Sequence, residues 1–386
     1  KICLKKVVFT LKCSQSKMSK VTPYKPFEGI RVLELASVLA GPLAGSFFAE
    51  GGATVIKVEH PELGDITRSW RTENEGQEDE LSAYYAAANT YKNVHRVDLK
   101  TQEGQDWLDE ELGKCDILLQ NFKEKDLVKF NLVPSEIAEK FPQLIHIRLL
   151  GFASQPERLA YDVVVQAETG FMNMNGAENG EATKMPVAMM DILASHQIRS
   201  AALSGLYARE KGRSGWFAEV SLELSAISAL ANQATNYLMN ENVPKRQGSL
   251  HPNIAPYGEQ LHLDGGSIVL AVGSDSQFSA LCKILGSFEL STDERFCDNH
   301  ARVKNRSILI KELQNLAKAH SRNSLLNSFH SKGVPAGAIK DLKEVFASGS
   351  PGEKAVIQEE IEGSNRTVRK PATTAYSVTV FGKYTV

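Results

Sequence analysis

Apolar and polar residues follow an alternating strand and helix pattern through the first half of the chain. Residues 29–35 and 54–59 carry apolar and β-branched side chains in the short runs typical of buried strands. Between them, 43–50 predicts a short helix that begins after a break at Ala40-Gly41-Pro42 and ends at Gly51. A strand, a helix and a second strand at this spacing predict parallel pairing of the two strands.

The same alternation continues further along the chain. The apolar spacing predicts helices and strands in turn, at 102–112 (helix), 116–120 (strand), 134–140 (helix), 144–149 (strand), 191–210 (helix), 216–220 (strand) and 225–240 (helix). This order favours an α/β fold, a Rossmann-like doubly wound parallel sheet with helices on both faces.

The pattern changes after Val243. Residues 244–266 are rich in Pro, Gly and polar side chains, and a strand at 267–272 and helices at 277–285 and 305–317 follow. We interpret this region as a smaller α+β domain, and 334–339 as a strand that returns to the first sheet. The expected division is an N-terminal extension at 1–25, a large domain at 26–222, a small domain with linkers at 223–330, and a returning C-terminal segment at 331–386.

Composition narrows the class of protein. The 386 residues are 42% hydrophobic, enough for two domains, and the net charge of −2 gives no support for nucleic-acid binding. The five cysteines are scattered without the spacing of a metal site, which favours a reducing, cytoplasmic compartment and no bound metal. No apolar run approaches the ~18 residues of a membrane span, so no membrane association is expected.

A set of short motifs, in one order, identifies the chain as similar to a known family. The motifs are Gly29-Ile-Arg-Val-Leu-Glu-Leu35, Ala40-Gly41-Pro42, Val55-Ile-Lys-Val-Glu59, Gly64-Asp65 with Thr67-Arg68, Asn121-Phe122, Tyr161-Asp162, Lys211-Gly-Arg-Ser-Gly215, His251-Pro-Asn-Ile-Ala-Pro-Tyr257 and Gly333-Val-Pro-Ala-Gly337. Together they resemble the family III CoA-transferases, a group that also contains acyl-CoA racemases. The resemblance implies an interlocked homodimer, with each active site between the large domain of one subunit and the small domain of the other.

Asp191 is the candidate nucleophile. Its place before an apolar helix is also that of a helix N-cap, and from the residues alone the cap is the favoured interpretation. The resemblance instead implies a CoA-transferase in which this carboxylate carries CoA from an acyl-CoA donor to a carboxylic acid acceptor, through a covalent aspartyl-CoA intermediate. Coenzyme A would be a co-substrate, and acyl-CoA and carboxylates would be the partners. Small dicarboxylic acids such as succinate are the family-level expectation for the acyl group.

The resemblance also implies which residues bind CoA. The candidates are Leu39, Ala40, Lys57, Arg68, Asn121, Phe122, Lys129 and Tyr161. Each has a plain alternative: a strand–helix turn for Leu39 and Ala40, solvated or paired surface charges for the basic residues, and packed aromatic rings for Phe122 and Tyr161. Leu39 stands where formyl-CoA transferase has Gln, which argues against formyl or oxalyl specificity.

Two other functions stay open from the sequence. The first is an acyl-CoA racemase or epimerase, which Tyr161 disfavours because racemases of this group carry a catalytic His there and tyrosine, with a pKa of about 10, is a poor base at neutral pH. The second is a CoA-binding homologue without activity, because a helix cap would also preserve an aspartate.

Overall fold

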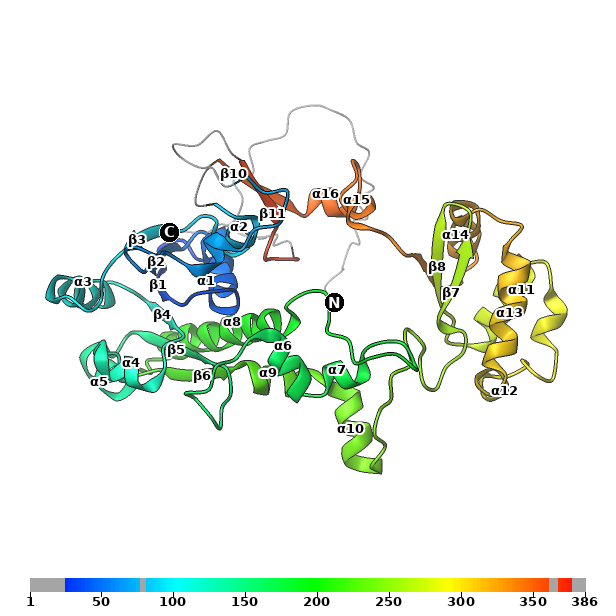
Figure 1. The fold of residues 1–386 in the computed structure, drawn as a ribbon, viewed down its shortest axis with the longest axis horizontal. Helices are drawn as coiled ribbons and strands as arrows, with labels where there is room; N and C mark the ends of the chain where they lie inside the picture. Colours follow the sequence, from blue (N-terminus) through cyan, green and yellow to red (C-terminus); the bar gives the residue numbers. More distant parts are fainter. Residues whose placement is uncertain (1–24, 77–80, 361–366, 377–386) are drawn as a thin grey trace, which may run out of the picture.

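The computed structural model describes residues 25–76, 81–360 and 367–376, and the expected extension lies almost entirely outside them. A large α/β part, which contains a six-stranded sheet, is joined to a smaller part by two stretches of chain (Figure 1). The strands are β1 (Arg31–Leu35), β2 (Thr54–Glu59), β3 (Asn93–Arg96), β4 (Ile117–Gln120), β5 (Ile145–Leu150), β6 (Phe217–Ser221), β7 (Tyr257–Leu263), β8 (Gly266–Ala271), β9 (Ala336–Ala338), β10 (Val356–Glu360) and β11 (Thr367–Pro371).

The longer helices cover the sheets, and shorter ones lie in the connections. The α-helices are α1 (Ala40–Glu50), α2 (Ala83–Asn89), α3 (Gln102–Leu112), α4 (Glu124–Lys129), α5 (Pro134–Lys140), α6 (Asp162–Glu168), α7 (Phe171–Met174), α8 (Met189–Glu210), α9 (Leu222–Ala229), α10 (Ala231–Asn240), α11 (Asp275–Ile284), α12 (Asn299–Lys304), α13 (Arg306–Ala317), α14 (Arg322–Ser331), α15 (Leu342–Val345) and α16 (Pro351–Lys354). Two short 3-10 helices, η1 (Ile66–Ser69) and η2 (Phe288–Ser291), complete the set.

The large sheet confirms the predicted parallel α/β architecture. Its strand order is β3-β2-β1-β4-β5-β6, and every neighbouring pair is parallel. Successive residues of a strand face opposite sides, so Val32 joins the core beneath α1 and α8, while Leu33 joins the core beneath α3, α4 and α5. Burial on both faces explains the nearly continuous apolar runs of the central strands.

The smaller part has its own sheet and its own core. β7, β8 and β9 form an antiparallel sheet, and residues of α11, α13 and α14 pack on it around Phe278, Leu313 and Phe329. The prediction that 334–339 returns to the large sheet is wrong, because β9 pairs with β8. Only four residues separate α14 from β9, too short a connection to leave this part.

Three local predictions also need correction. Ala40-Gly41-Pro42 does not break the chain but forms the first turn of α1, where proline has no intrahelical hydrogen bond to lose. The helix expected at 225–240 is two helices, α9 and α10, divided at Leu230. β7 lies within 244–266, where no strand was predicted, and α2 and β3 were not predicted either.

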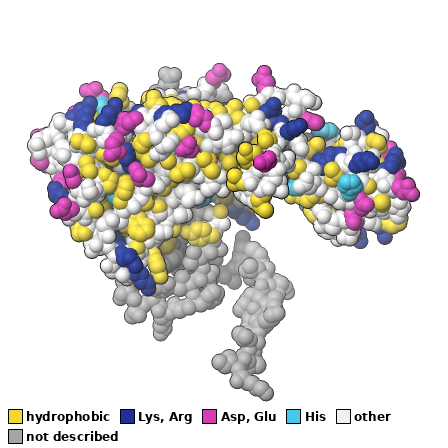
Figure 2. Space-filling model, turned by 90° about the horizontal axis from the view of Figure 1, so that it is seen from below, with side chains coloured by type: hydrophobic (Ala, Val, Ile, Leu, Met, Phe, Trp, Pro, Cys, Tyr) yellow, Lys and Arg dark blue, Asp and Glu magenta, His cyan; other side chains and the backbone are white. Residues whose placement is uncertain are grey.

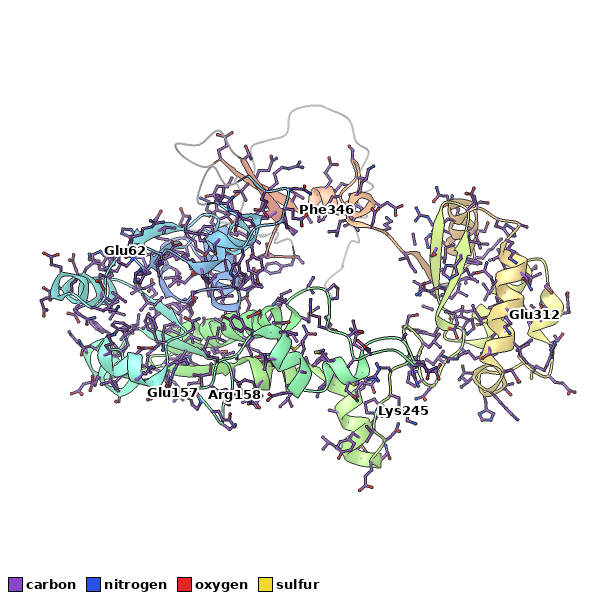
Figure 3. All side chains as sticks on the ribbon, in the orientation of Figure 1. Glu62, Glu157, Arg158, Lys245, Glu312 and Phe346 are labelled. Carbon is purple, nitrogen blue, oxygen red and sulfur yellow. The ribbon has the colours of Figure 1, made fainter. Side chains whose placement is uncertain are left out.

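The chain passes between the two parts twice; in Figure 3, Lys245 lies in the first passage and Phe346 follows the second, at the end of α15. After the second passage, the β10–β11 hairpin lies against the large part. The Lys370 ammonium there lies 2.7 Å from Glu50 at the end of α1, and the Thr373 N–H donates to the same carboxylate at 2.7 Å. Among the described residues, no helix is both long and apolar enough to cross a membrane.

Candidate active site

The carboxyl ends of β1 and β4 lie side by side at the middle of the large sheet. Their last residues, Leu35 and Gln120, are paired neighbours. From β1 the chain builds the sheet toward β3, and from β4 it builds toward β6. In open α/β sheets, ligands bind outside the carboxyl ends of the strands at such a reversal, so a ligand is expected here.

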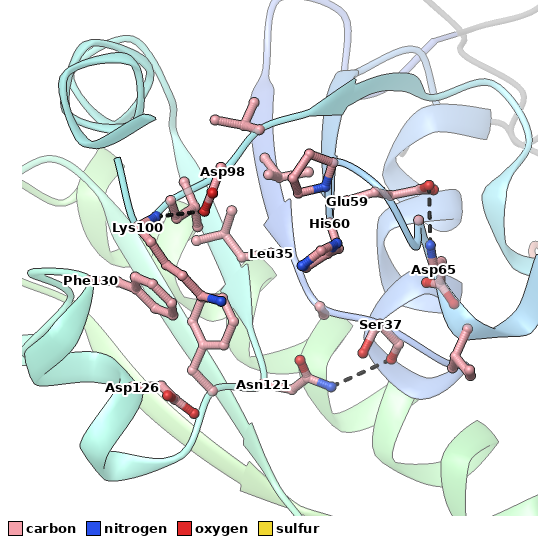
Figure 4. A pocket seen from close by; sticks show the side chains of 18 of the residues that line it. Leu35, Ser37, Glu59, His60, Asp65, Asp98, Lys100, Asn121, Asp126 and Phe130 are labelled. Carbon is pink, nitrogen blue, oxygen red and sulfur yellow. Dashed lines mark hydrogen bonds between the residues drawn. The ribbon is translucent and has the colours of Figure 1, made fainter. Parts of the chain in front are cut away.

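A cavity of about 470 Å³ lies at this edge (Figure 4). Its walls come from the loops that follow four strands, and include Ala36 and Ser37 after β1, His60 and Asp65 after β2, Asp98 and Lys100 after β3, and Asn121 and Phe122 after β4. The volume is in the usual range for small-molecule sites, roughly 300–1,000 Å³.

Two of the predicted CoA-binding residues line this cavity. The Asn121 amide donates to the Ser37 carbonyl at 3.5 Å, and the Phe122 ring lies 5.1 Å from the Phe130 ring. The Phe122 backbone is held at both ends, because its N–H donates to Gln120 at 2.7 Å and its carbonyl accepts from Arg148 at 3.3 Å. Lys129 is exposed at the end of α4, with its ammonium 5.2 Å from the centre of the Phe130 ring.

Lys57 lies beneath the cavity rather than on its surface. Its side chain is 1% exposed, and its ammonium lies 3.1 Å from Glu34 and 3.0 Å from Asp65. Burial alone would lower the pKa of Lys57, but these two carboxylates raise it above its ordinary value. A phosphate contact by Lys57 would require these ion pairs to separate.

Arg68 is also engaged within the protein. Its guanidinium pairs with both oxygens of Glu59, at 2.8 and 2.9 Å, and donates to the Tyr85 hydroxyl at 2.6 Å. Burial would raise the pKa of Glu59, but the hydrogen bonds from Arg68 and Tyr85 hold it below its ordinary value. This cluster fixes the turn between β2 and η1.

Leu39 and Ala40 begin α1 beside the cavity. Leu39 is the N-cap residue and makes no side-chain cap hydrogen bond, and Ala40 is buried. A Cβ on Gly41 would lie 2.4 Å from that of Ala36, so only glycine allows the loop to approach so closely.

Three basic side chains that line the cavity were missed in the sequence: His60, Lys100 and Lys123. In Figure 4, His60 and Phe130 lie on opposite sides of the cavity. Lys100 could not be placed because β3, the strand before it, was not predicted. The signal that would have found His60 and Lys123 is their position just beyond a strand's carboxyl end.

Asp191 lies in the first turn of α8. The N-cap of α8 is Ala188, so the interpretation of Asp191 as the cap is wrong. Within the part of the chain that the structure describes, the Asp191 carboxyl has no hydrogen-bond or ion-pair partner. Burial and the nearby Asp162 carboxylate raise its pKa from 3.8 to about 7.

Asp162 supports the start of α8 from outside the helix. Its carboxylate accepts a hydrogen bond from the Met190 N–H at 2.7 Å, and it is also bonded to Gln166. Gln166 in turn accepts from the Met185 N–H at 2.7 Å. Asp162 therefore fixes the backbone that carries Asp191.

Tyr84 lies on α2. Burial and, after it, the carboxylates of Asp191, Asp162 and Asp65 raise its pKa. The ring packs edge-on against Trp70 at 5.0 Å. Sequence reasoning missed Tyr84 because α2, which carries it, was not predicted.

Tyr161 stands next to Asp162, at the N-cap of α6. Its side chain is 57% exposed and makes no cap hydrogen bond. Of the titratable clusters in the described ranges, none has three or more His, Cys, Asp or Glu side chains arranged to hold a metal ion.

Comparison with known proteins identifies the family. The model of CoA-transferase family III matches residues 27–379. The chain belongs to this family. It is 37% identical to the succinate–glutarate CoA-transferase of Agrobacterium fabrum, over 83% of this chain and 82% of that protein. It is 34% identical to human succinyl-CoA:glutarate CoA-transferase, over 89% of this chain and 78% of that one.

A solved structure has the same fold. The crystal structure of a CAIB/BAIF family protein from Brucella suis matches with a TM-score of 0.79 and 35% identity, over 92% of this chain and 93% of that one. The family and these relatives establish a transferase enzyme that uses CoA substrates, as the sequence motifs predicted.

Proposed function

We propose that this CoA-transferase uses Asp191 as a covalent nucleophile. The carboxylate attacks the thioester carbonyl of the donor, forming a mixed anhydride and releasing the CoA thiolate. The thiolate then attacks the aspartyl carbonyl, which gives aspartyl-CoA and frees the donor's carboxylate. The acceptor carboxylate attacks aspartyl-CoA in the same way, and the returning thiolate forms the new acyl-CoA and restores Asp191.

The observation that carries this proposal is the state of the Asp191 carboxyl. It is half-buried at the start of a long helix, without an ion-pair partner among the described residues, and its pKa is raised to about 7. A carboxylate that is weakly solvated and unpaired is a better nucleophile than one held by a cation, and the helix N-terminus favours the negative charge that develops next to it. Although the raised pKa lowers the ionised fraction, a pKa of about 7 still leaves a substantial fraction of the carboxyl ionised at neutral pH.

CoA is proposed to occupy the cavity at the carboxyl ends of β1 to β4. Asn121 and Phe122 line it, Ala40 and Leu39 lie at its β1 side, and Lys129 lies at its rim beside Phe130. His60, Lys100 and Lys123 add positive charge suited to phosphates. Tyr161 is proposed to face the substrate near Asp191, while Lys57 and Arg68 act through their ion pairs.

The proposed acyl groups are small dicarboxylates. The relatives at 37% and 34% identity are named for succinate or succinyl-CoA and for glutarate, and this chain is proposed to use the same class. The racemase alternative is not favoured, because these relatives are named as transferases.

A homodimer is proposed to complete the site. No residue of α10 is buried, and Tyr237, Leu238 and Met239 expose apolar side chains. Figure 2, seen from the side of α10, shows hydrophobic side chains across the middle of this face. Size-exclusion chromatography with light scattering tests this proposal, and a monomer at micromolar concentration would contradict it.

A cytoplasmic location stays the prediction from the scattered cysteines.

The deciding experiment uses intact-mass and peptide-mapping spectrometry. The protein is incubated with succinyl-CoA, glutaryl-CoA or acetyl-CoA without an acceptor. A CoA-sized adduct on the peptide that contains Asp191, absent from Asp191→Asn, is the expected result. CoA binding without an adduct for any donor would contradict the covalent mechanism.

A further inference from the structure

One carboxylate and two ammonium groups meet beneath the cavity, in the interior of the large part. Glu34 on β1 is paired in register with Lys57 on the adjacent β2. The Glu34 carboxylate lies 3.1 Å from the Lys57 ammonium and 2.8 Å from that of Lys92. All three side chains are at most 1% exposed. Such pairs give up favourable hydration of their charges, so burial of ions is weak evidence for a purely stabilising role.

The two ammonium groups hold backbone as well as carboxylates. Lys57 donates to the Ala36 carbonyl at 3.0 Å, just after β1, and Lys92 donates to the Pro42 carbonyl at 2.8 Å, in the first turn of α1. The two contacts fix both ends of the segment 36–42. This segment includes Ala36 and Ser37 of the cavity wall and the predicted CoA-binding residues Leu39 and Ala40.

Lys57 also reaches the neighbouring part of the cavity wall, which follows β2. Its ammonium lies 3.0 Å from Asp65, whose other oxygen accepts from the Thr67 N–H at 3.0 Å and from the Thr67 hydroxyl at 2.7 Å. Ala36 and Asp65 both line the cavity, on the β1 side and the β2 side. One buried ammonium therefore ties the two walls together.

The backbone of the held segment is unfavourable by itself. Val38 has φ of +73°, a left-handed conformation that β-branched residues seldom adopt. The helix that follows lies directly on the cluster, since a Cβ on Gly45 would be 1.8 Å from a Glu34 carboxylate oxygen. A strained loop persists only where its surroundings determine it, and here the ion cluster provides the contacts at both ends.

We propose that Glu34, Lys57 and Lys92 are positioning residues that preform the CoA cavity, with Lys57 setting the distance between its β1 and β2 walls. This inference rests on the proposed function, because the cavity is taken to be the CoA site. Lys57 contributes to CoA affinity without touching the ligand. This role explains why the motif Val55-Ile-Lys-Val-Glu59 contains a lysine whose ammonium is buried. The chemical step at Asp191 depends on it only indirectly.

The test uses the double variant Lys57→Met/Asp65→Asn, which removes both charges and leaves no unpaired carboxylate at Asp65, while Glu34 keeps Lys92. The expected result is a rise of about tenfold or more in the Kd of CoA and in KM for succinyl-CoA, with kcat within about threefold of wild type. Amide hydrogen exchange in peptides covering 36–43 and 60–66 is expected to accelerate by at least about tenfold without ligand.

The matched control is Lys370→Met, which breaks another buried ion pair, with Glu50, whose residues do not line the cavity. It is expected to leave CoA affinity and exchange at 36–43 and 60–66 unchanged. Unchanged affinity and exchange in a folded double variant would overturn the proposal, as would equal changes in the control. If circular dichroism shows the double variant unfolded, Asp65→Asn alone carries the test, with faster exchange at 60–66 and weaker CoA binding expected.

The two proposals fail in different ways. If wild type binds CoA but forms no adduct and transfers no CoA, the covalent function is wrong. Amide hydrogen exchange needs no substrate, so it still tests whether Glu34, Lys57 and Lys92 hold the cavity walls in place.

Discussion

Buried or half-buried carboxylates occur in two regions of the large part, and the surroundings shift their pKa in opposite directions. At the cavity wall, Asp65 faces the Lys57 ammonium at 3.0 Å and Glu59 faces the Arg68 guanidinium at 2.8 Å. Burial alone would raise the pKa of both carboxyls, but these cations and hydrogen bonds hold the pKa below its ordinary value. At the start of α8, Asp191 has no such cation, and burial and Asp162 raise its pKa to about 7.

The difference in charge pairing suits Asp65 and Glu59 to a structural role and Asp191 to the proposed chemical role. A paired carboxylate is already stabilised by its cation and gains little from reacting. An unpaired buried carboxylate is destabilised in its charged form, and formation of a neutral ester-like bond relieves that cost. Function is therefore expected where the charge balance is incomplete, and structure where it is complete.

The largest expected effect comes from removal of the unpaired carboxylate. Asp191→Asn keeps the shape of the side chain but cannot form the anhydride, so kcat for CoA transfer from succinyl-CoA to glutarate should fall by about 10³-fold or more. Chromatographic quantification of glutaryl-CoA measures it. Asp264→Asn, at an exposed carboxylate of the smaller part, is the control and should keep wild-type kcat. Retention of more than a tenth of wild-type activity by Asp191→Asn would exclude the nucleophile role.

The next effect is on stability and concerns the paired region. Lys57→Met alone leaves Asp65 buried without its cation, which should lower the free energy of unfolding by about 3–5 kcal/mol. Denaturant titration at pH 7.5 measures it. Because the pKa of Asp65 is lowered by folding, the stabilisation by its carboxylate is present above its ordinary pKa and is lost as pH falls through the folded value.

An exposed ion pair provides the matched control for that measurement. Lys114 lies 2.6 Å from Glu110, but both side chains are about half exposed or more. Lys114, which also lies 2.9 Å from Glu111, is itself 45% exposed, so Lys114→Met should lower the free energy of unfolding much less than Lys57→Met, because solvent screens its ion pairs. If the two variants lose similar free energies of unfolding, the buried pair of Lys57 with Asp65 contributes no more to stability than an exposed pair.

Asp191→Asn should also stabilise the protein at alkaline pH, the opposite of the effect at Lys57. The folded state raises the pKa of Asp191 from 3.8 to about 7, so its ionisation destabilises the fold progressively over this range and fully above it. The difference corresponds to at most about 4 kcal/mol. Thermal unfolding at pH 8 and pH 4 measures it, with a higher Tm for the variant at pH 8 and a small difference at pH 4. A variant less stable than wild type at pH 8 would contradict the raised pKa.

The same contrast explains what the sequence could and could not predict. The strands with buried apolar runs, such as β1, β2 and β4, were found because burial on both faces leaves a pattern in the sequence. β3 was missed because all four of its residues are exposed at the edge of the sheet. β9 was found as a strand, but three small residues do not specify which sheet they join.

The site shows a similar limit. Motifs marked Asp191, Asn121 and Phe122 as candidates because each motif is local to its segment, and Asn121 and Phe122 line the cavity. The burial of Lys57 could not be read in the same way, since its partners Glu34 and Asp65 stand on other segments and only pairing of β1 with β2 brings them together. The sequence shows which residues are charged, but only the folded structure shows which of them form ion pairs.

The smallest expected effect tests how the Asp162 charge changes the pKa of Asp191. Asp162→Asn removes the negative charge that helps to raise the pKa of Asp191, while an amide oxygen can still accept from the Met190 N–H. Since the carboxylate form is the proposed nucleophile, kcat/KM should rise with pH through about pH 7 in wild type and then level off. In the variant this limb should move to lower pH by about one unit or less, because burial is the larger cause and remains. Rates of CoA transfer from pH 5 to 9 measure both profiles, and superimposable curves would show that the Asp162 charge does not act on the nucleophile.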